Sequence, residues 1–281
     1  MSTFLDALWQ FSFLQHAMLA GLLASIGCGV IGTYVVVKRI TFLAGGIAHA
    51  VLGGMGIAYY FQQPVLLGAL IAALGTALFI GWVYLHNQQN EDTLIGAVWA
   101  TGMAVGILFI SQTPGYNVDL MSYLFGNILM VSRTDLYLMA GLDAVIVLTV
   151  ILFYKQLLVT CFDEEFAQLR NVSVTFFYLL LLCMVALTVV LLIRVVGLIL
   201  VIALLTLPAA IALQYAMSLS YIMLLASVLG IIFTSTGLGI AYEYNLPAGA
   251  SIILVAAASY FVSTLVIQSL LKKMRALHES G

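Results

Sequence analysis

The chain has 281 residues, of which 64% are hydrophobic and 7% are charged, and its formal net charge is −2. Soluble domains carry about 25% charged residues, so this chain cannot cover a water-facing surface and is expected to be a polytopic membrane protein. The small net charge excludes a nucleic-acid reader that depends on a strong basic field, and no nucleic-acid partner is expected.

Nine hydrophobic segments qualify as membrane spans, because a helix needs about 20 apolar residues to cross the hydrocarbon core. They lack the period-two alternation of barrel strands, so an all-α protein is predicted, with residues 1–281 as a single transmembrane domain. The sixth and seventh segments meet at Arg194 with almost no loop, so one is short or broken, and eight full spans are the alternative. The segments are residues 14–37, 42–61, 65–85, 93–112, 135–154, 174–193, 195–216, 221–241 and 249–271.

The second segment holds an isolated titratable residue, His49, in the stretch "GGIAHAVLGG". Gly45, His49, Gly53 and Gly56 share one helix face, and small residues let another helix approach closely. An ionisable residue inside a membrane is a functional hypothesis by default. His49 is therefore predicted to border a translocation path. The alternative is that His49 hydrogen-bonds a neighbouring helix while the glycines only permit tight packing.

Two acidic residues are further candidates for the path. Asp143 lies in the fifth segment, and a charge at mid-membrane costs about 2.5–3.5 kcal/mol on insertion scales, so it should face protein or water. Glu243 precedes a turn formed by Asn245 and Pro247, where it could line an outer vestibule. A plain connecting loop is the other interpretation of that turn.

The loop "VTCFDEEFAQLRNVS", residues 159–173, is predicted to form a short amphipathic helix over about 162–170. An acidic N-cap followed by two acids suits the positive end of a helix dipole. Three apolar residues at i, i+4 and i+7 share one face, which would fill a groove of a partner. A solvated loop with one helical turn is the alternative. The predicted docking residues are Phe162, Asp163, Glu164, Glu165, Phe166 and Leu169.

Gly197 and Pro208 interrupt the apolar run of residues 194–215. Proline removes a backbone hydrogen bond, and backbone freed at membrane depth is tolerated only inside protein or beside a water-filled cavity. Interrupted helices of this kind occur at the translocation route of transporters. An ordinary proline kink is the alternative.

The placement of lysine and arginine predicts the orientation. With the tail "KKMR" (residues 272–275) in the cytoplasm and alternating spans, only Arg133 and Arg194 fall outside, in agreement with the positive-inside rule. Nine spans then put the N-terminus outside, and eight would put it inside.

No lysine stands in the phosphate-binding pattern G-x-x-x-x-G-K-[ST], and neither H-E-x-x-H nor G-x-S-x-G occurs. The chain is therefore not expected to be an enzyme. If ATP drives it, a separate subunit must hydrolyse the ATP, and the helix at 162–170 is the natural docking point.

Six segments in order resemble the membrane permease subunits of bacterial ABC importers for divalent metals, the zinc, manganese and iron group also called ABC-3. Six such segments over nearly the whole chain are specific for that family. They are "YVVVKRITFLAGGIAHAVLGG", "EDTLIGAVWATGMAVGILF", "SYLFGNILMVSRTDL", "FDEEFAQLRNV", "GLILVIALLTLPAAIA" and "GLGIAYEYNLPAGASIILV".

The resemblance implies a fold like that of the cobalamin and siderophore permeases (type II ABC importers). It implies a homodimer in the inner (plasma) membrane with a cytoplasmic C-terminus, ABC ATPase subunits, and a periplasmic or lipid-anchored metal-binding protein. Zinc, manganese or iron would be cargo, with no stably bound cofactor.

In that family the second span usually carries Asp and, four residues later, His. Here His49 is kept, but Gly45 stands at the Asp position. One imidazole cannot hold a divalent metal alone. A two-fold axis would bring together the His49 of two copies, and Asp143 could replace the missing carboxylate if the fifth span lines the route.

Two other transport functions remain as alternatives. A permease for a metal chelate such as a siderophore would not need a histidine in a path wide enough for its bulky cargo. An ion-driven secondary transporter or channel would need no partner and would show inverted repeats, and no convincing repeat is evident.

Overall fold

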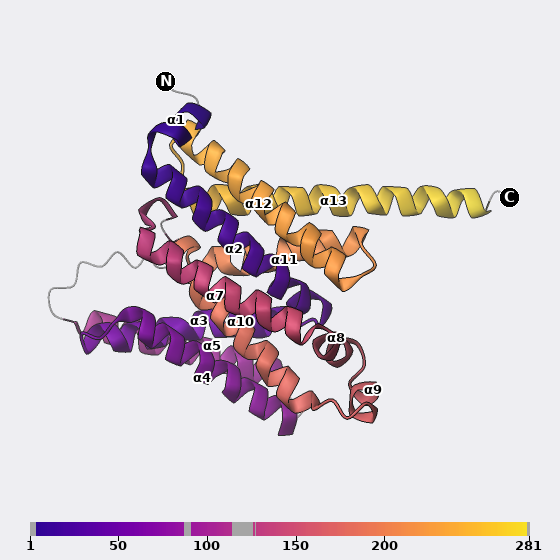
Figure 1. Ribbon diagram of the computed structural model, residues 1–281, viewed down its shortest axis with the longest axis horizontal. Helices are drawn as coiled ribbons and strands as arrows, with labels where there is room; N and C mark the ends of the chain where they lie inside the picture. Colours follow the sequence, from indigo (N-terminus) through magenta and orange to yellow (C-terminus); the bar gives the residue numbers. More distant parts are fainter. Residues whose placement is uncertain (1–3, 87–90, 114–125, 127, 280–281) are drawn as a thin grey trace.

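The computed structural model describes residues 4–86, 91–113, 126 and 128–279, which form a helical bundle without strands (Figure 1). Part of the stretch "SYLFGNILMVSRTDL" (residues 122–136) and the side chains of Arg194 and residues 268–279 lie outside the described set. The elements are α1 (Phe4–Gln10), α2 (Ser12–Val37), α3 (Thr41–Tyr60), α4 (Val65–His86), α5 (Glu91–Ser111), η1 (Ile128–Met130), α7 (Arg133–Leu152), α8 (Tyr154–Phe162), α9 (Glu164–Leu169), α10 (Val174–Val196), α11 (Leu198–Tyr215), α12 (Leu219–Tyr244) and α13 (Ala248–Glu279).

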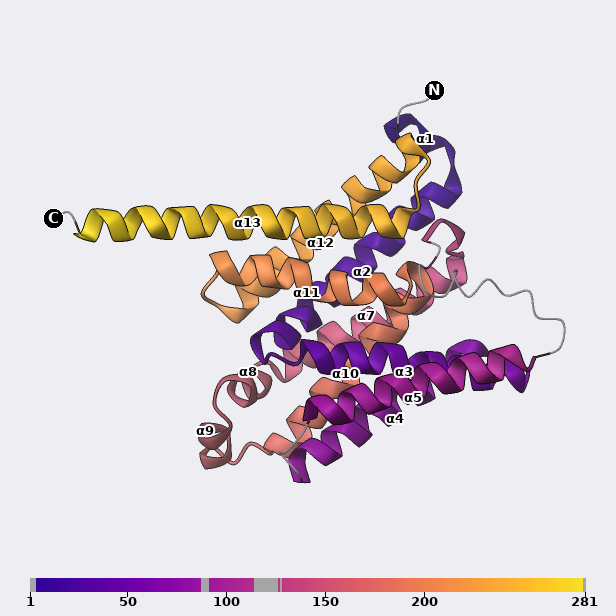
Figure 2. The ribbon, with the colours of Figure 1, turned by 180° about the vertical axis from the view of Figure 1, so that it is seen from behind.

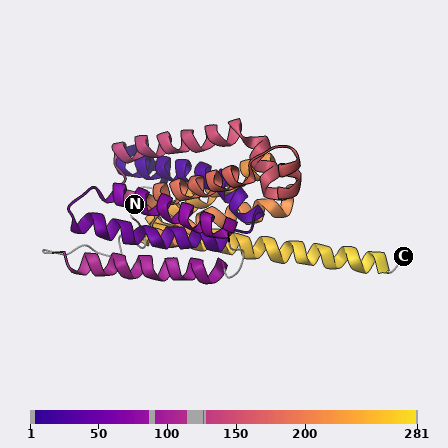
Figure 3. The same cartoon turned by 90° about the horizontal axis from the view of Figure 1, so that it is seen from below.

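Among the described residues, eight helices are long and apolar enough to cross a membrane, namely α2, α3, α4, α5, α7, α10, α12 and α13. The shorter apolar helix α11 matches the seventh predicted segment, so the alternative of eight full spans, with one of the nine segments short, is confirmed. Because α11 runs back through the bundle after α10, the N-terminal α1 and the end of α13 lie at opposite ends of the molecule (Figure 1). Figure 3 shows α13 extending past the other helices.

The interruption near residue 200 lies at Gly197 and not at Pro208. Gly197 ends α10 and precedes α11 with φ 79°, a backbone conformation that side-chain-bearing residues rarely adopt. Pro208 lies inside α11, which continues to Tyr215. The helix therefore breaks where the backbone needs glycine, and the proline is accommodated within the next helix.

The predicted amphipathic helix at 162–170 is divided between two elements. Phe162 is the last residue of α8, a helix that the sequence pattern does not predict. The Asp163 side chain then accepts a hydrogen bond from the backbone N–H of Phe166 (2.9 Å) and begins α9, as predicted for an N-cap. The hydropathy pattern missed α8 because nine residues are too few to stand out as a membrane span, and Leu157 and Thr160 are buried only through tertiary contacts.

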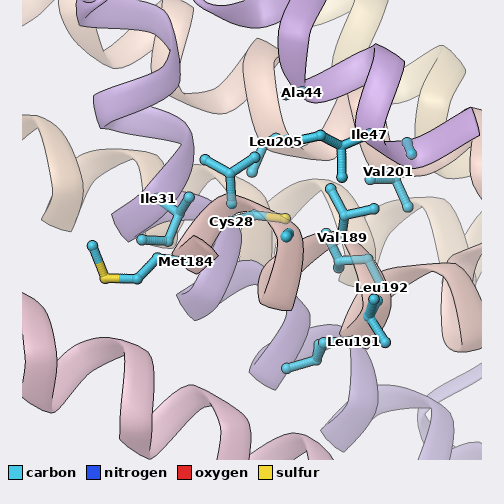
Figure 4. Packing of buried hydrophobic residues seen from close by; sticks show 14 of the residues in the cluster. Cys28, Ile31, Ala44, Ile47, Met184, Val189, Leu191, Leu192, Val201 and Leu205 are labelled. Atoms are coloured by element: carbon cyan, nitrogen blue, oxygen red, sulfur yellow. The ribbon is translucent and has the colours of Figure 1, made fainter. Parts of the chain in front are cut away.

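The core lies where α2, α3, α10 and α11 meet. Figure 4 shows Cys28 of α2, Ile47 of α3, Val189 of α10, and Val201 and Leu205 of α11 converging there. The α12 and α13 helices pack against one side of this core, α4 and α5 against α3, and α7 against α2. The central position of α3 fixes where His49 can lie.

Glycines bring α3 into backbone contact with its neighbours. A Cβ on Gly53 would lie 2.8 Å from the carbonyl oxygen of Gly102, and one on Gly102 would lie 2.6 Å from Cα of Ala50. On another side of α3, Gly54 faces Gly68 of α4 just as closely. Figure 2 shows α5 lying along α3. The glycine stripe of the second span therefore serves packing within the chain.

We expect Gly102→Ala to destabilise the protein by about 1–3 kcal/mol, because the added methyl group overlaps the backbone of α3. Gly96→Ala on the same helix is the matched control: its Cβ meets nothing within 4 Å, and alanine is favoured over glycine in a helix by up to about 1 kcal/mol. Thermal unfolding of the detergent-solubilised variants measures the difference. Equal melting temperatures would contradict the close approach of α3 and α5.

Candidate functional site

His49 lies half-buried on α3, with its ring stacked on the indole of Trp99 from α5. The ring centroids are 4.0 Å apart and the planes differ by 9°. The Trp99 Nε1–H donates to the Met103 sulfur (3.2 Å), one turn further along α5, which fixes the indole beneath the imidazole. Stacking on Trp99 holds the His49 ring in place, and the ring nitrogens take no part in that contact.

Neither nitrogen of His49 has a hydrogen-bond partner among the described residues. The Nδ1 atom is enclosed and unpartnered. The hydrogen bond from His49 to a neighbouring helix that the alternative assumed is therefore not found among the described residues, although the glycines do pack as that alternative assumed. A neutral imidazole with a free lone pair is a ligand type that suits zinc and similar divalent metals.

Gly45 lies one turn before His49 in an apolar environment. A Cβ there would be 3.4 Å from Cδ1 of Ile202 and 3.7 Å from Cζ3 of Trp99, which are ordinary contacts. Ile202 belongs to α11, so the helix that follows the Gly197 break borders the His49 site. Within the described ranges, no three His, Cys, Asp or Glu residues are close enough together to hold a metal ion. A single chain therefore presents one imidazole and no completed site.

Asp143 is placed elsewhere, between α7 and α2. Its side chain is 5% exposed, and neither carboxylate oxygen has a partner in the described part of the chain. A Cβ on Gly27 of α2 would lie 2.5 Å from its Oδ1. The α7 helix packs against α2 and α10, whereas α3 packs against α4, α5, α10 and α11. The structure does not bring Asp143 to His49, so the idea that it replaces the missing carboxylate gains no support.

Glu243 holds the N-terminal helix in place. Its Oε1 accepts a hydrogen bond from the backbone N–H of Phe4 (3.0 Å), at the start of α1. A carboxylate at this position satisfies one of the open N–H groups at the start of a helix. Glu243 therefore lies at the same end of the bundle as α1, far along the chain from the other candidates, and its role in a vestibule stays a prediction.

The predicted docking helix α9 lies at the end of the bundle opposite α1 (Figure 2), and its apolar residues are exposed. The exposed fractions are 66% for Phe162, 43% for Phe166 and 82% for Leu169, whereas Ala167 is fully buried beneath them. The guanidinium of Arg170 lies 5.3 Å from the centre of the Phe166 ring. The end of α8 and the helix α9 therefore expose three large apolar side chains outside the membrane-spanning helices.

The residue that holds α9 on the bundle is not among those predicted from the sequence. Lys38, at the end of α2, forms an ion pair with Glu164 (Nζ–Oε1 2.6 Å). Glu164 therefore turns toward the bundle and not outward with the predicted docking face. The only signal in the sequence was a lysine at the end of a span, and nothing in the pattern links it to a residue 126 positions away.

A family model described as "ABC 3 transport family" matches residues 10–267. The chain is 49% identical to an uncharacterized membrane protein of Synechocystis sp. over 90% of both chains. It is 37% identical to the manganese transport system membrane protein MntC of Halalkalibacterium halodurans, over 92% of this chain and 88% of that one.

Among solved structures, the chain is similar to PsaBC from Streptococcus pneumoniae in complex with Fab. That likeness has a TM-score of 0.84 and 35% identity and covers 92% of this chain and 94% of the other. A second structure, an ABC transporter assigned to the metal-chelate type, has a TM-score of 0.72 and 14% identity, which shows the fold alone.

We expect Gly27→Ala to destabilise the protein by about 1–3 kcal/mol through overlap with the Asp143 carboxylate. Asp143→Ala in the same chain should relieve that overlap, giving a coupling of about 0.5–3 kcal/mol in a double-mutant cycle. Thermal unfolding in detergent measures both, with Gly141→Ala on α7 as the control because its Cβ has open space. Strictly additive effects would show that Asp143 does not face α2.

Proposed function

We propose, since the chain belongs to the ABC 3 transport family, that it is the membrane permease subunit of an ATP-driven importer of divalent metal ions. The observation that carries the proposal is similarity along almost the whole chain to proteins named manganese transport system membrane proteins. The chain is an integral membrane protein by its eight apolar helices, and we place it in the plasma membrane with α9 and the C-terminus in the cytoplasm.

His49 marks the path of the cation in this proposal. Its ring is fixed by Trp99 and its nitrogens are left without partners, which is what a ligand for a passing ion needs. One imidazole does not hold a divalent metal, so a second chain must contribute. Two permeases related by a two-fold axis would pair their His49 side chains. Imidazole nitrogens suit zinc and iron, whereas manganese favours oxygen ligands such as carboxylate, carbonyl or water. The metal is cargo, and no resident cofactor is invoked.

In this proposal the ATPase acts on the permease at α9. The sequence has no phosphate-binding loop, so a separate cytoplasmic ATPase must supply the energy. We expect it to bind the exposed apolar side chains of Phe162, Phe166 and Leu169. Asp163 fixes the start of the helix by capping it, and Glu165 lies exposed in its first turn. A metal-binding protein outside the membrane would supply the ion at the end of the bundle that holds α1.

We expect His49→Ala to reduce Mn²⁺ uptake by about tenfold or more, because even the outer partners of metal ligands are worth about 10–100-fold. Uptake of Mn²⁺ by cells that express the variant with its partner subunits measures the effect. His86→Ala is the control, since His86 is an exposed histidine at the end of α4 bonded to the Trp82 carbonyl. Wild-type uptake by His49→Ala would remove His49 from the path.

We expect Phe166→Asp to leave the chain inserted in the membrane but to abolish copurification of the ATPase, because the charge replaces an apolar contact. Phe166→Leu keeps an apolar side chain and should retain the ATPase. Pull-down from detergent extracts with a tag on the permease is the measurement. Equal recovery of the ATPase with both variants would refute docking through this face.

A further inference from the structure

We propose that Lys38 is a positioning residue that transmits movement of the docking helix α9 to α3, the helix that carries His49. This inference rests on the proposed function, because it takes α9 as the point where the ATPase acts. Lys38 belongs to neither the docking face nor the His49 site. Its proposed role follows from two observations: its side chain contacts α8, α9 and α10, and its backbone lies in the link between α2 and α3.

The Lys38 ammonium joins three elements at once. Its Nζ donates to Oε1 of Glu164 in α9 (2.6 Å) and to the backbone carbonyl of Thr160 near the end of α8 (3.1 Å). The same nitrogen lies 5.4 Å from the centre of the Tyr178 ring in α10, a cation–π distance. This ion pair lies between the end of α2 and the docking helix.

The environment of Lys38 makes this contact hard to break. Its side chain is 9% exposed, and removing one partner of such a pair leaves a charge buried without compensation. Burial raises the pKa of the nearby Cys161 thiol to about 11, with a further increase from Glu164 that opposes the effect of Lys38. The thiol is therefore neutral at physiological pH, and Glu164 is the anion that faces the ammonium. The Thr160 carbonyl at the negative end of α8 adds to the attraction.

The backbone at Lys38 is a tight corner between α2 and α3. Arg39 adopts a left-handed conformation (φ 61°), and its N–H donates to the carbonyl of Val36 (3.2 Å). The N–H of Ile40 donates to the carbonyl of Val35 (3.0 Å), which completes a Schellman motif. Since α3 begins at the next residue, Thr41, a displacement of the Lys38 side chain acts on the start of α3 through a short, hydrogen-bonded link.

From that corner α3 leads directly to the imidazole. His49 is eight residues beyond Thr41, about 12 Å along a helix that rises 1.5 Å per residue. The glycine contacts at Gly53 and Gly102 join α3 to α5, so Trp99 must move with the ring that it supports. A shift of α9 therefore reaches the path through Lys38 without requiring the outer helices α12 and α13 to move.

The neighbouring Arg39 supplies a matched comparison. It carries the same charge at the same corner, but its side chain is exposed. Lys38→Met and Arg39→Met each remove one positive charge and keep an unbranched side chain, so they differ mainly in the contact to α9. Lys38→Arg restores a cation at the buried position, and Glu164→Gln removes the charge from the other side of the pair at a less buried site.

The test uses the permease purified with its ATPase and reconstituted in proteoliposomes, with Mn²⁺ and the binding protein on the side of α1. We expect Lys38→Met to copurify with the ATPase and to hydrolyse ATP, while Mn²⁺ moved per ATP falls about fivefold or more, as for a typical coupling between sites. Glu164→Gln should show the same loss, and the double variant should be no worse than either single one. Lys38→Arg should recover coupling, and Arg39→Met should match the wild type.

A wild-type ratio of Mn²⁺ to ATP in Lys38→Met would overturn the inference, as would an equal loss in Arg39→Met. Loss of the ATPase from Lys38→Met would also overturn it, because Lys38 would then shape the docking surface and not transmit its movement. Absence of Mn²⁺ transport by the wild-type complex is a different result, and it would overturn the proposed function instead.

Discussion

Backbone contact between helices at glycine positions sets the geometry of this protein. In lipid, burying an apolar side chain gains little, because the acyl chains are as apolar as leucine, and close packing has to hold the helices together. Gly32 of α2 meets the carbonyl of Leu205 in α11, and Gly53 of α3 meets that of Gly102 in α5. These contacts leave α3 enclosed by α4, α5, α10 and α11. The location of His49, and of everything that acts on it, follows from that enclosure.

Three ionisable side chains in this bundle differ in whether their polar atoms have hydrogen-bond or ion-pair partners. Lys38 is fully compensated, by Glu164 and a backbone carbonyl, and it joins elements. Asp143 is enclosed against α2 with neither oxygen partnered among the described residues. His49 is held only through the face of its ring, so its nitrogens are left for another molecule. A polar group whose hydrogen bonds are complete serves the fold, and an incomplete one at a fixed position is available for binding.

The two ends of the molecule have separate tasks that α3 connects. At one end, α1 is anchored by Glu243, and at the other, α8 and α9 expose an apolar surface. The Lys38 corner fastens that surface to the beginning of α3. Movement at the docking end can thereby be translated into a change around His49, while the helices at the periphery provide a frame. This division is what an importer driven by an external motor requires.

The sequence alone determined the features that depend on local chemistry: the apolar spans, the cap at Asp163, the break near Gly197 and the isolated His49. Each follows from residue types within a few positions of one another. Only the tertiary structure decided that Asp143 faces α2, that Glu164 turns inward to Lys38, and that Trp99 supports the imidazole. Apolar helices with almost no amphipathic signal can pack in many ways, and the choice among them depends on the shape of whole helix surfaces that no short stretch of sequence specifies.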